Sequence, residues 1–108
     1  MTGIVYQWHP DLVDDFRELP RDLQAAYLEQ IEEIKADPKL GEHLDLRAST
    51  GDLSAYRKVK FGHDTPRGPS HRIVYQLLPD SYSPSQFRVI AVRSRADVYD
   101  IAAKRLNK

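Results

Sequence analysis

Residues 55–61 have the sequence AYRKVKF, which combines strand-forming residues with two lysines, Lys58 and Lys60. Alternate residues of a β-strand point to the same face, so the two lysines share one side, while Val59 and Phe61 share the other. Two neighbouring ammonium groups repel each other and add nothing to a core. An exposed sheet face is the simplest explanation. A function for the pair therefore depends on which charges the fold brings beside it.

Three segments rich in β-branched and aromatic residues predict consecutive strands at residues 53–61, 72–78 and 87–93. The connections between them, 62–70 and 79–85, are rich in Gly, Pro and Ser, as loops are. Short connections favour antiparallel pairing, so the three segments are expected to form a meander.

Another strand and three helices complete the prediction. IVYQW at 4–8 is typical of a short strand, and apolar residues at spacings of three and four predict helices at 9–19, 21–36 and 97–106. The expected fold is α+β in the order β-α-α-β-β-β-α, with the helices against one face of a small antiparallel sheet. All 108 residues are expected to form a single domain.

The composition restricts the kind of protein. A hydrophobic fraction of 41% and a charged fraction of 30% are typical of a soluble globular chain. The chain has no cysteine, which excludes disulfides and thiolate chemistry. It has neither a long apolar run nor a signal-peptide pattern, so we expect a cytoplasmic protein that does not enter a membrane. We find no Asp, Glu and His spacing that predicts a metal site, and expect no cofactor.

A net charge of zero conceals a strong asymmetry between the two halves of the chain. Residues 1–54 hold 5 Lys and Arg against 12 Asp and Glu, whereas residues 55–108 hold 11 against 4. The first half therefore carries a balance of −7 and the second of +7. Such a separation suggests a basic working surface, for which nucleic acid is the first candidate partner.

The meander gathers cations at one end of the sheet. Lys58 and Lys60 lie near the end of the first meander strand, Arg72 begins the second, and Arg93 ends the third. We expect the four to lie close together, open to solvent and without a carboxylate partner, and Arg93→Ala to change stability by no more than about 1 kcal/mol. Such a cluster favours phosphate. RNA supplies its own nucleophile, the 2′-OH, and its cleavage needs alignment, proton transfer and charge stabilisation.

Three stretches of the chain resemble a known family. AYRKVKF at 55–61, HRIVYQ at 71–76 and VRSRADVYDIAAKRL at 92–106 closely resemble the corresponding segments of RelE-type toxins of bacterial type II toxin–antitoxin systems. The order of elements fits that family over nearly the whole chain, and the specific motifs occupy the C-terminal half. Segment 62–70 is several residues longer than is usual in the family, and the chain is neutral where members are often basic.

The resemblance implies a ribosome-dependent endoribonuclease that cuts mRNA by attack of the 2′-OH and leaves a 2′,3′-cyclic phosphate. Lys58 and Lys60 match the family's K-x-K strand, and Arg72 matches the arginine of its R-[IL]-V-Y-Q strand. Arg93 matches the arginine that ends the last strand, and Tyr99 the tyrosine of the helix that follows. The residue that acts as general base and the one that acts as general acid stay open among Lys58, Lys60, Arg93 and Tyr99.

Two further arginines, Arg57 beside the lysine pair and Arg95 in the last motif, are expected to contact RNA. The partners that the resemblance implies are a cognate antitoxin, the 70S ribosome and mRNA. The antitoxin is expected to cover the basic surface or to displace the C-terminal helix.

Two other functions stay open. A ParE-like toxin uses the same fold to inhibit DNA gyrase, and a non-catalytic nucleic-acid-binding module could use the same basic edge.

Several other residues have a plainer explanation than catalysis. Tyr75 is expected to pack in the core, Trp8 to lie in the core or at the sheet edge, and His71 to face away from Arg72. His63 and Asp64 could form an acid–base pair, but a solvated loop explains them better.

Overall fold

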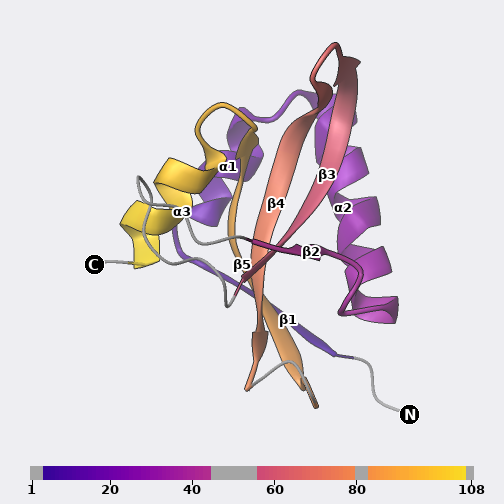
Figure 1. The fold of residues 1–108 in the computed structure, drawn as a ribbon, viewed down its shortest axis with the longest axis vertical. Helices are drawn as coiled ribbons and strands as arrows, with labels where there is room; N and C mark the ends of the chain where they lie inside the picture. The colour runs from indigo at the N-terminus through magenta and orange to yellow at the C-terminus, as the bar shows by residue number, and fades with distance from the viewer. Residues whose placement is uncertain (1–3, 45–55, 80–82, 107–108) are drawn as a thin grey trace.

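The computed structural model describes residues 4–44, 56–79 and 83–106. Within them the chain forms three helices and a five-stranded sheet (Figure 1). The elements in chain order are β1 (Val5–Trp8), α1 (Leu12–Glu18), α2 (Arg21–Ala36), β2 (Glu42–His43), β3 (Tyr56–Thr65), β4 (Gly68–Leu78), β5 (Gln86–Ser94) and α3 (Val98–Leu106).

The sheet has the strand order β1-β5-β4-β3-β2. The predicted meander of β3, β4 and β5 is confirmed, because both pairs are antiparallel. The α+β class is also confirmed, but a wholly antiparallel sheet is wrong: β1 lies parallel to β5. The first and last strands thus lie side by side. Parallel neighbours need a long connection, and the helices and the meander strands between β1 and β5 supply it.

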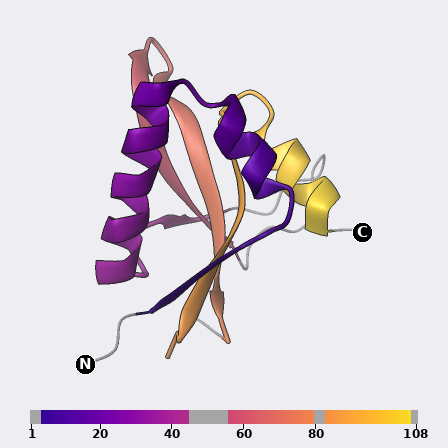
Figure 2. The same ribbon diagram turned by 180° about the vertical axis from the view of Figure 1, so that it is seen from behind.

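The helices cover both faces of the sheet, not one as expected (Figure 2). One face packs Ile73, Phe87 and Val89 against the buried side of α1 and α2. The opposite face packs Val74 and Ala91 against α3. The central strands β4 and β5 are covered from both sides, which explains their nearly continuous apolar sequences.

The segment predicted as a long loop, 62–70, is mostly strand. β3 continues to Thr65 and β4 begins at Gly68, so only Pro66 and Arg67 lie between them. The register shifts between Phe61 and Asp64, where Gly62 has φ of 104°, a conformation that glycine adopts without strain. The resulting hairpin projects beyond the other strands at the top of Figure 1.

Tyr75 packs in the core, as expected, and also fixes the chain after α2. It is fully buried, and its hydroxyl accepts a hydrogen bond from the Gly41 amide at 2.9 Å and donates one to the Pro38 carbonyl at 2.8 Å. A Cβ at Gly41 would lie 2.7 Å from the Tyr75 hydroxyl, so this approach requires glycine. The contact holds the segment that leads to β2, a two-residue strand that the sequence pattern did not predict.

We expect Tyr75→Phe to lower the free energy of unfolding by about 1–3 kcal/mol, because the Gly41 amide and the Pro38 carbonyl lose a buried partner. Urea denaturation measures the change. Tyr56→Phe is the matched control, since Tyr56 is only partly buried. Equal midpoints for the two variants would contradict a stabilising role for the buried hydroxyl.

Candidate active site

Three cations form a row across the three central strands. Lys60 lies opposite Arg72, and Arg72 lies opposite Arg93. Lys58, two residues before Lys60, lies opposite Val74 on the same face. The predicted convergence of the four cations is therefore confirmed, but their predicted place at one end of the sheet is wrong. β3 continues beyond Lys60 to Thr65 and β4 begins at Gly68, before Arg72, so only Arg93 lies near the end of its strand.

The C-terminal helix brings Tyr99 to Lys58, beside this row. The Lys58 ammonium lies 5.8 Å from the centroid of the Tyr99 ring, within the range of a cation–π contact. Tyr99 is partly buried where α3 packs on the sheet. The sheet and the helix thus place an amine and a phenol side by side, two groups capable of proton transfer.

Lys60 is the most open of the row. Its side chain is 43% exposed, and its ammonium lies 3.9 Å from a carboxylate oxygen of Glu42, which is also exposed. The expectation of no carboxylate partner is therefore wrong for Lys60. An ion pair this long and exposed is weak, so an incoming phosphate could replace Glu42.

Arg72 is buried, with 7% of its surface exposed, so the expectation that it is open to solvent is wrong. Its Nη1 donates to the carbonyls of Pro69 at 2.6 Å and His71 at 3.0 Å. The reason is that Arg72 lies in the central strand, between Lys60 of β3 and Arg93 of β5, and that its guanidinium folds back onto the backbone of its own strand. Its positive charge lies at the centre of the row without a carboxylate among its described contacts.

Arg93 is held by three carboxylates. It donates to Asp15 at 3.0 Å, to Asp97 at 2.9 and 3.0 Å, and to Glu18 at 3.4 Å. Its side chain is 26% exposed and borders a small cavity of about 120 Å³ beside these acids. The hydrogen bonds that Arg93 donates to Asp97 and then to Asp15 raise the pKa of Arg93 above its usual range, although partial burial opposes them. The expectation of an unpaired Arg93 is wrong.

Asp15 is the residue of this region that the sequence analysis missed. Its side chain is 0% exposed, and its oxygens accept hydrogen bonds from the Val92 amide at 3.1 Å and from Arg105 at 2.6 and 2.8 Å, besides that from Arg93. The Arg105 side chain also donates to the Ile90 carbonyl at 2.8 Å. Asp15 therefore joins α1, β5 and α3, and Arg93 belongs to a structural network as well as to the cation row.

Solved structures with the same arrangement of elements decide the fold. An E. coli RelE toxin mutant in the free state superposes with a TM-score of 0.63 at 20% identity, covering 97% of this chain and 99% of that one. The toxin–antitoxin complex RelBE2 from Mycobacterium tuberculosis gives 0.63 at 17% identity, over 87% of this chain and 100% of that one. The fold is that of the RelE toxins.

The RelE fold extends to an archaeal structure. The RelE–RelB complex from Pyrococcus horikoshii gives a TM-score of 0.53 at 14% identity, over 87% of this chain and 97% of that one. No protein-family model and no curated protein sequence matches the chain.

Of the two arginines predicted to contact RNA, Arg57 has structural contacts in this RelE fold. Arg57 and Lys58 point to different faces of the sheet. On its own face, Arg57 donates to the carbonyls of Gly41 at 2.7 Å and Lys39 at 3.2 Å. It also lies 3.0 Å from His43 Nε2. These contacts fasten β2 to β3. The other arginine, Arg95, lies in the turn between β5 and α3.

The histidines do not form part of the cation row. His63 Nε2 lies 2.6 Å from an Asp22 oxygen, so it contacts α2 and not Asp64, and this hydrogen bond lowers the pKa of Asp22. His71 packs against Phe61 on the face away from Arg72, as expected, and burial lowers its pKa.

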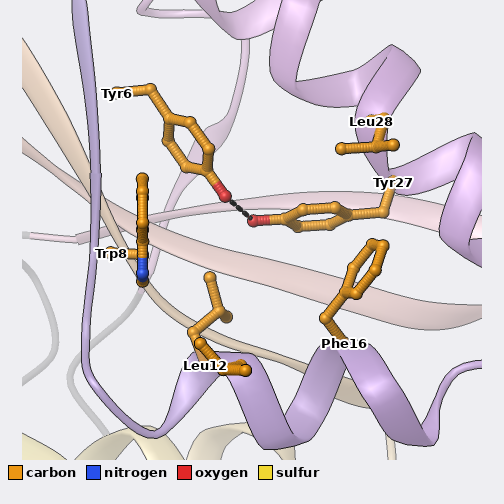
Figure 3. A pocket seen from close by; sticks show the side chains of 7 residues that line it. Tyr6, Trp8, Leu12, Phe16, Tyr27 and Leu28 are labelled. Carbon is orange, nitrogen blue, oxygen red and sulfur yellow. Dashed lines mark hydrogen bonds between the residues drawn. The ribbon is translucent and has the colours of Figure 1, made fainter.

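An apolar hollow lies on the side of the fold formed by β1, α1 and α2 (Figure 3). It has a volume of about 220 Å³ and is lined by aromatic and aliphatic side chains. Trp8 borders it from edge strand β1, as expected of a residue at the sheet edge, and the Tyr6 and Tyr27 hydroxyls hydrogen-bond across it at 2.6 Å. The hollow has no charged lining residue and is unsuited to phosphate.

Among the residues that the structure describes, no three His, Asp or Glu side chains are grouped so that they could hold a metal ion. In the same residues, no helix combines the length and apolar character needed to span a membrane.

Proposed function

We propose that the protein is the toxin of a type II toxin–antitoxin system and that it cleaves mRNA on the ribosome. The RelE fold supports the toxin class. The observation that carries the catalytic part is the row of Lys60, Arg72 and Arg93, with Lys58 and Tyr99 close together on the same face of the sheet. The three cations lie on adjacent strands of the sheet, and Lys60 is the most exposed of them. A phosphate could therefore approach from solvent on the side of Lys60.

The proposed reaction is attack of a ribose 2′-OH on the adjacent phosphorus, which displaces the 5′-oxygen and leaves a 2′,3′-cyclic phosphate. Lys60 and Arg72 stabilise the negative charge that develops on the phosphate. Arg93 is unsuited to proton transfer, because Asp97 and Asp15 raise its pKa further. Proton transfer is therefore assigned among Lys58, Lys60 and Tyr99.

The proposed partner in the resting cell is an antitoxin, as the similar RelBE and RelE–RelB complexes suggest. Helix α3 packs through Val98 and Ala102 and carries Tyr99 to Lys58. An antitoxin segment that displaced α3 would separate Tyr99 from Lys58 and so remove one of the groups assigned to proton transfer. A toxin of this kind would act in the cytoplasm, where the ribosome works.

One observation favours a second candidate, a ParE-like inhibitor of DNA gyrase. Arg93 is satisfied by Asp15, Asp97 and Glu18, and Arg72 by carbonyls of its own strand. Structural roles explain both arginines without any chemistry on RNA. A non-catalytic nucleic-acid-binding protein would need only the exposed cations.

Cell-free translation followed by primer extension on the mRNA tests the proposal. We expect new mRNA ends that require active ribosomes, and little cleavage of the same RNA without them, because the ribosome aligns the 2′-OH. Inhibition of translation without new mRNA ends would contradict the nuclease. Inhibition of gyrase supercoiling without any effect on translation would establish the ParE-like alternative.

A further inference from the structure

A second pair of cations lies where the tip of the β3–β4 hairpin approaches the turn between β5 and α3, next to the row. There a cleft of about 400 Å³ separates the hairpin from the turn between β5 and α3. Arg67 contributes to the cleft from the hairpin and Arg95 from the turn. The hydroxyl-bearing residues Thr65, Ser70 and Ser94 also line it.

One backbone hydrogen bond and two bonds of the Thr65 hydroxyl hold the two walls of this cleft. The Arg95 amide donates to the Ser70 carbonyl at 3.0 Å, which ties the turn to β4. At the tip, the Thr65 hydroxyl donates to the Gly68 carbonyl at 2.6 Å and accepts from the Arg67 amide at 3.1 Å. The backbone that carries each arginine is therefore held in place, while the long side chains can adjust to a ligand.

The two guanidinium groups differ from Arg93 in their partners. Neither Arg67 nor Arg95 forms an ion pair within residues 4–44, 56–79 and 83–106. Asp97 is the acid that follows Arg95 most closely in sequence, and it forms its ion pair with Arg93. Asp64 precedes Thr65 in β3 and does not line the cleft. Two forked cations beside hydroxyl groups, without a carboxylate between them, suit a phosphate diester.

We propose that this cleft binds backbone phosphates of an RNA strand that also reaches the cation row. The inference rests on the proposed function, because it takes RNA as the ligand. The near edge of the cleft borders the row, because Ser94 directly follows Arg93. Its far edge at Thr65 lies roughly 16 Å from Lys60 along β3. A strand held at both places would cross the hairpin, and the cleft would set its direction over the row.

Binding of a labelled oligouridine to the purified protein, followed by fluorescence anisotropy over a series of salt concentrations, tests the cleft. Arg67→Ala and Arg95→Ala should each weaken binding and reduce the slope of log K against log salt by about 0.7, as expected for one lost contact to a single strand. Arg67→Lys should retain the slope, because it keeps the charge. Arg17→Ala, which removes an exposed arginine of α1, should change neither quantity.

The RNA strand could belong to the message or to the ribosome, and sedimentation with vacant and with mRNA-programmed ribosomes separates the two. Weaker retention of Arg67→Ala on both kinds of ribosome identifies ribosomal RNA, and weaker retention on programmed ribosomes alone identifies mRNA. Unchanged slopes for both Arg67→Ala and Arg95→Ala would overturn the cleft, even if the protein cleaves mRNA. Failure of the unsubstituted protein to bind oligouridine would overturn it too. If the two variants show reduced salt slopes but the unsubstituted protein does not cleave mRNA, the proposed nuclease is wrong and the proposed RNA-binding cleft is supported.

Discussion

Asp15→Ala is expected to lower the free energy of unfolding by about 3–5 kcal/mol, the usual result of removing one partner from a buried ion pair. The substitution leaves the Val92 amide without its acceptor, and Arg105 without its two shortest ionic contacts. Arg93 keeps Asp97 and the more distant Glu18. For a domain whose total stability is about 5–15 kcal/mol, this loss is a large part of the whole.

Asp14→Ala is the matched control, because it removes the neighbouring acid of the same helix. The Asp14 side chain is 75% exposed, and its contact with Arg17 is 3.9 Å long. Its loss should change stability by no more than about 0.5 kcal/mol. Urea denaturation of both variants gives the comparison. If Asp15→Ala and Asp14→Ala unfold at the same midpoint, the buried network contributes no net stability.

The cation row could be predicted from the sequence because it depends only on local rules. Alternation places Lys58 and Lys60 on one face, and short connections make β3, β4 and β5 a meander. The predicted strand limits then put Arg72 beside both Lys60 and Arg93, although β3 and β4 extend beyond these limits as a hairpin.

The partners of the row could not be predicted in this way. Asp15 and Arg93 are 78 residues apart, and no sequence spacing relates them. The one local signal is that Asp15 lies between Leu12 and Leu19 on the apolar side of α1, a position where an acid needs a buried partner. The position of Asp15 within this apolar stripe therefore indicates that a buried cation contacts it.

The hairpin was missed for another reason. Gly62 and Gly68, with φ of 104° and 98°, are residues that usually mark loops. Here Gly62 lies at an irregularity within β3, and Gly68 follows a turn of two residues. The composition of the segment is the same for a loop and for a hairpin with a bulge, so only the pairing of Asp64 with Pro69 and of Thr65 with Gly68 separates the two.

The buried network also determines where the proposed nuclease is best tested. Arg93→Ala would remove a contact of the cation row and one of the ionic contacts of Asp15 at the same time. Our sequence-based expectation of a stability change within about 1 kcal/mol is therefore withdrawn, since one partner of a buried pair is lost. A loss of cleavage in that variant would not separate chemistry from folding. Lys60 has no such second role.

Lys60→Ala is expected to reduce translation-dependent mRNA cleavage by about 10²–10³-fold, the usual cost of removing one group that stabilises charge in the transition state. Its only described ionic contact is the 3.9 Å pair with Glu42, so the free energy of unfolding should change by no more than about 0.5 kcal/mol. Primer extension on translated mRNA measures the first quantity, and urea denaturation the second.

Lys35→Ala is the matched control for this variant. Lys35 is likewise a partly exposed lysine with one acidic partner, Glu32 at 3.0 Å, but it lies in the last turn of α2, away from the row. Both variants lower the net charge by one, so a general effect of charge on binding to the ribosome would weaken them equally. A selective loss in Lys60→Ala requires a phosphate at the Lys60 end of the row. Near-normal cleavage by Lys60→Ala would show that the reaction does not depend on Lys60.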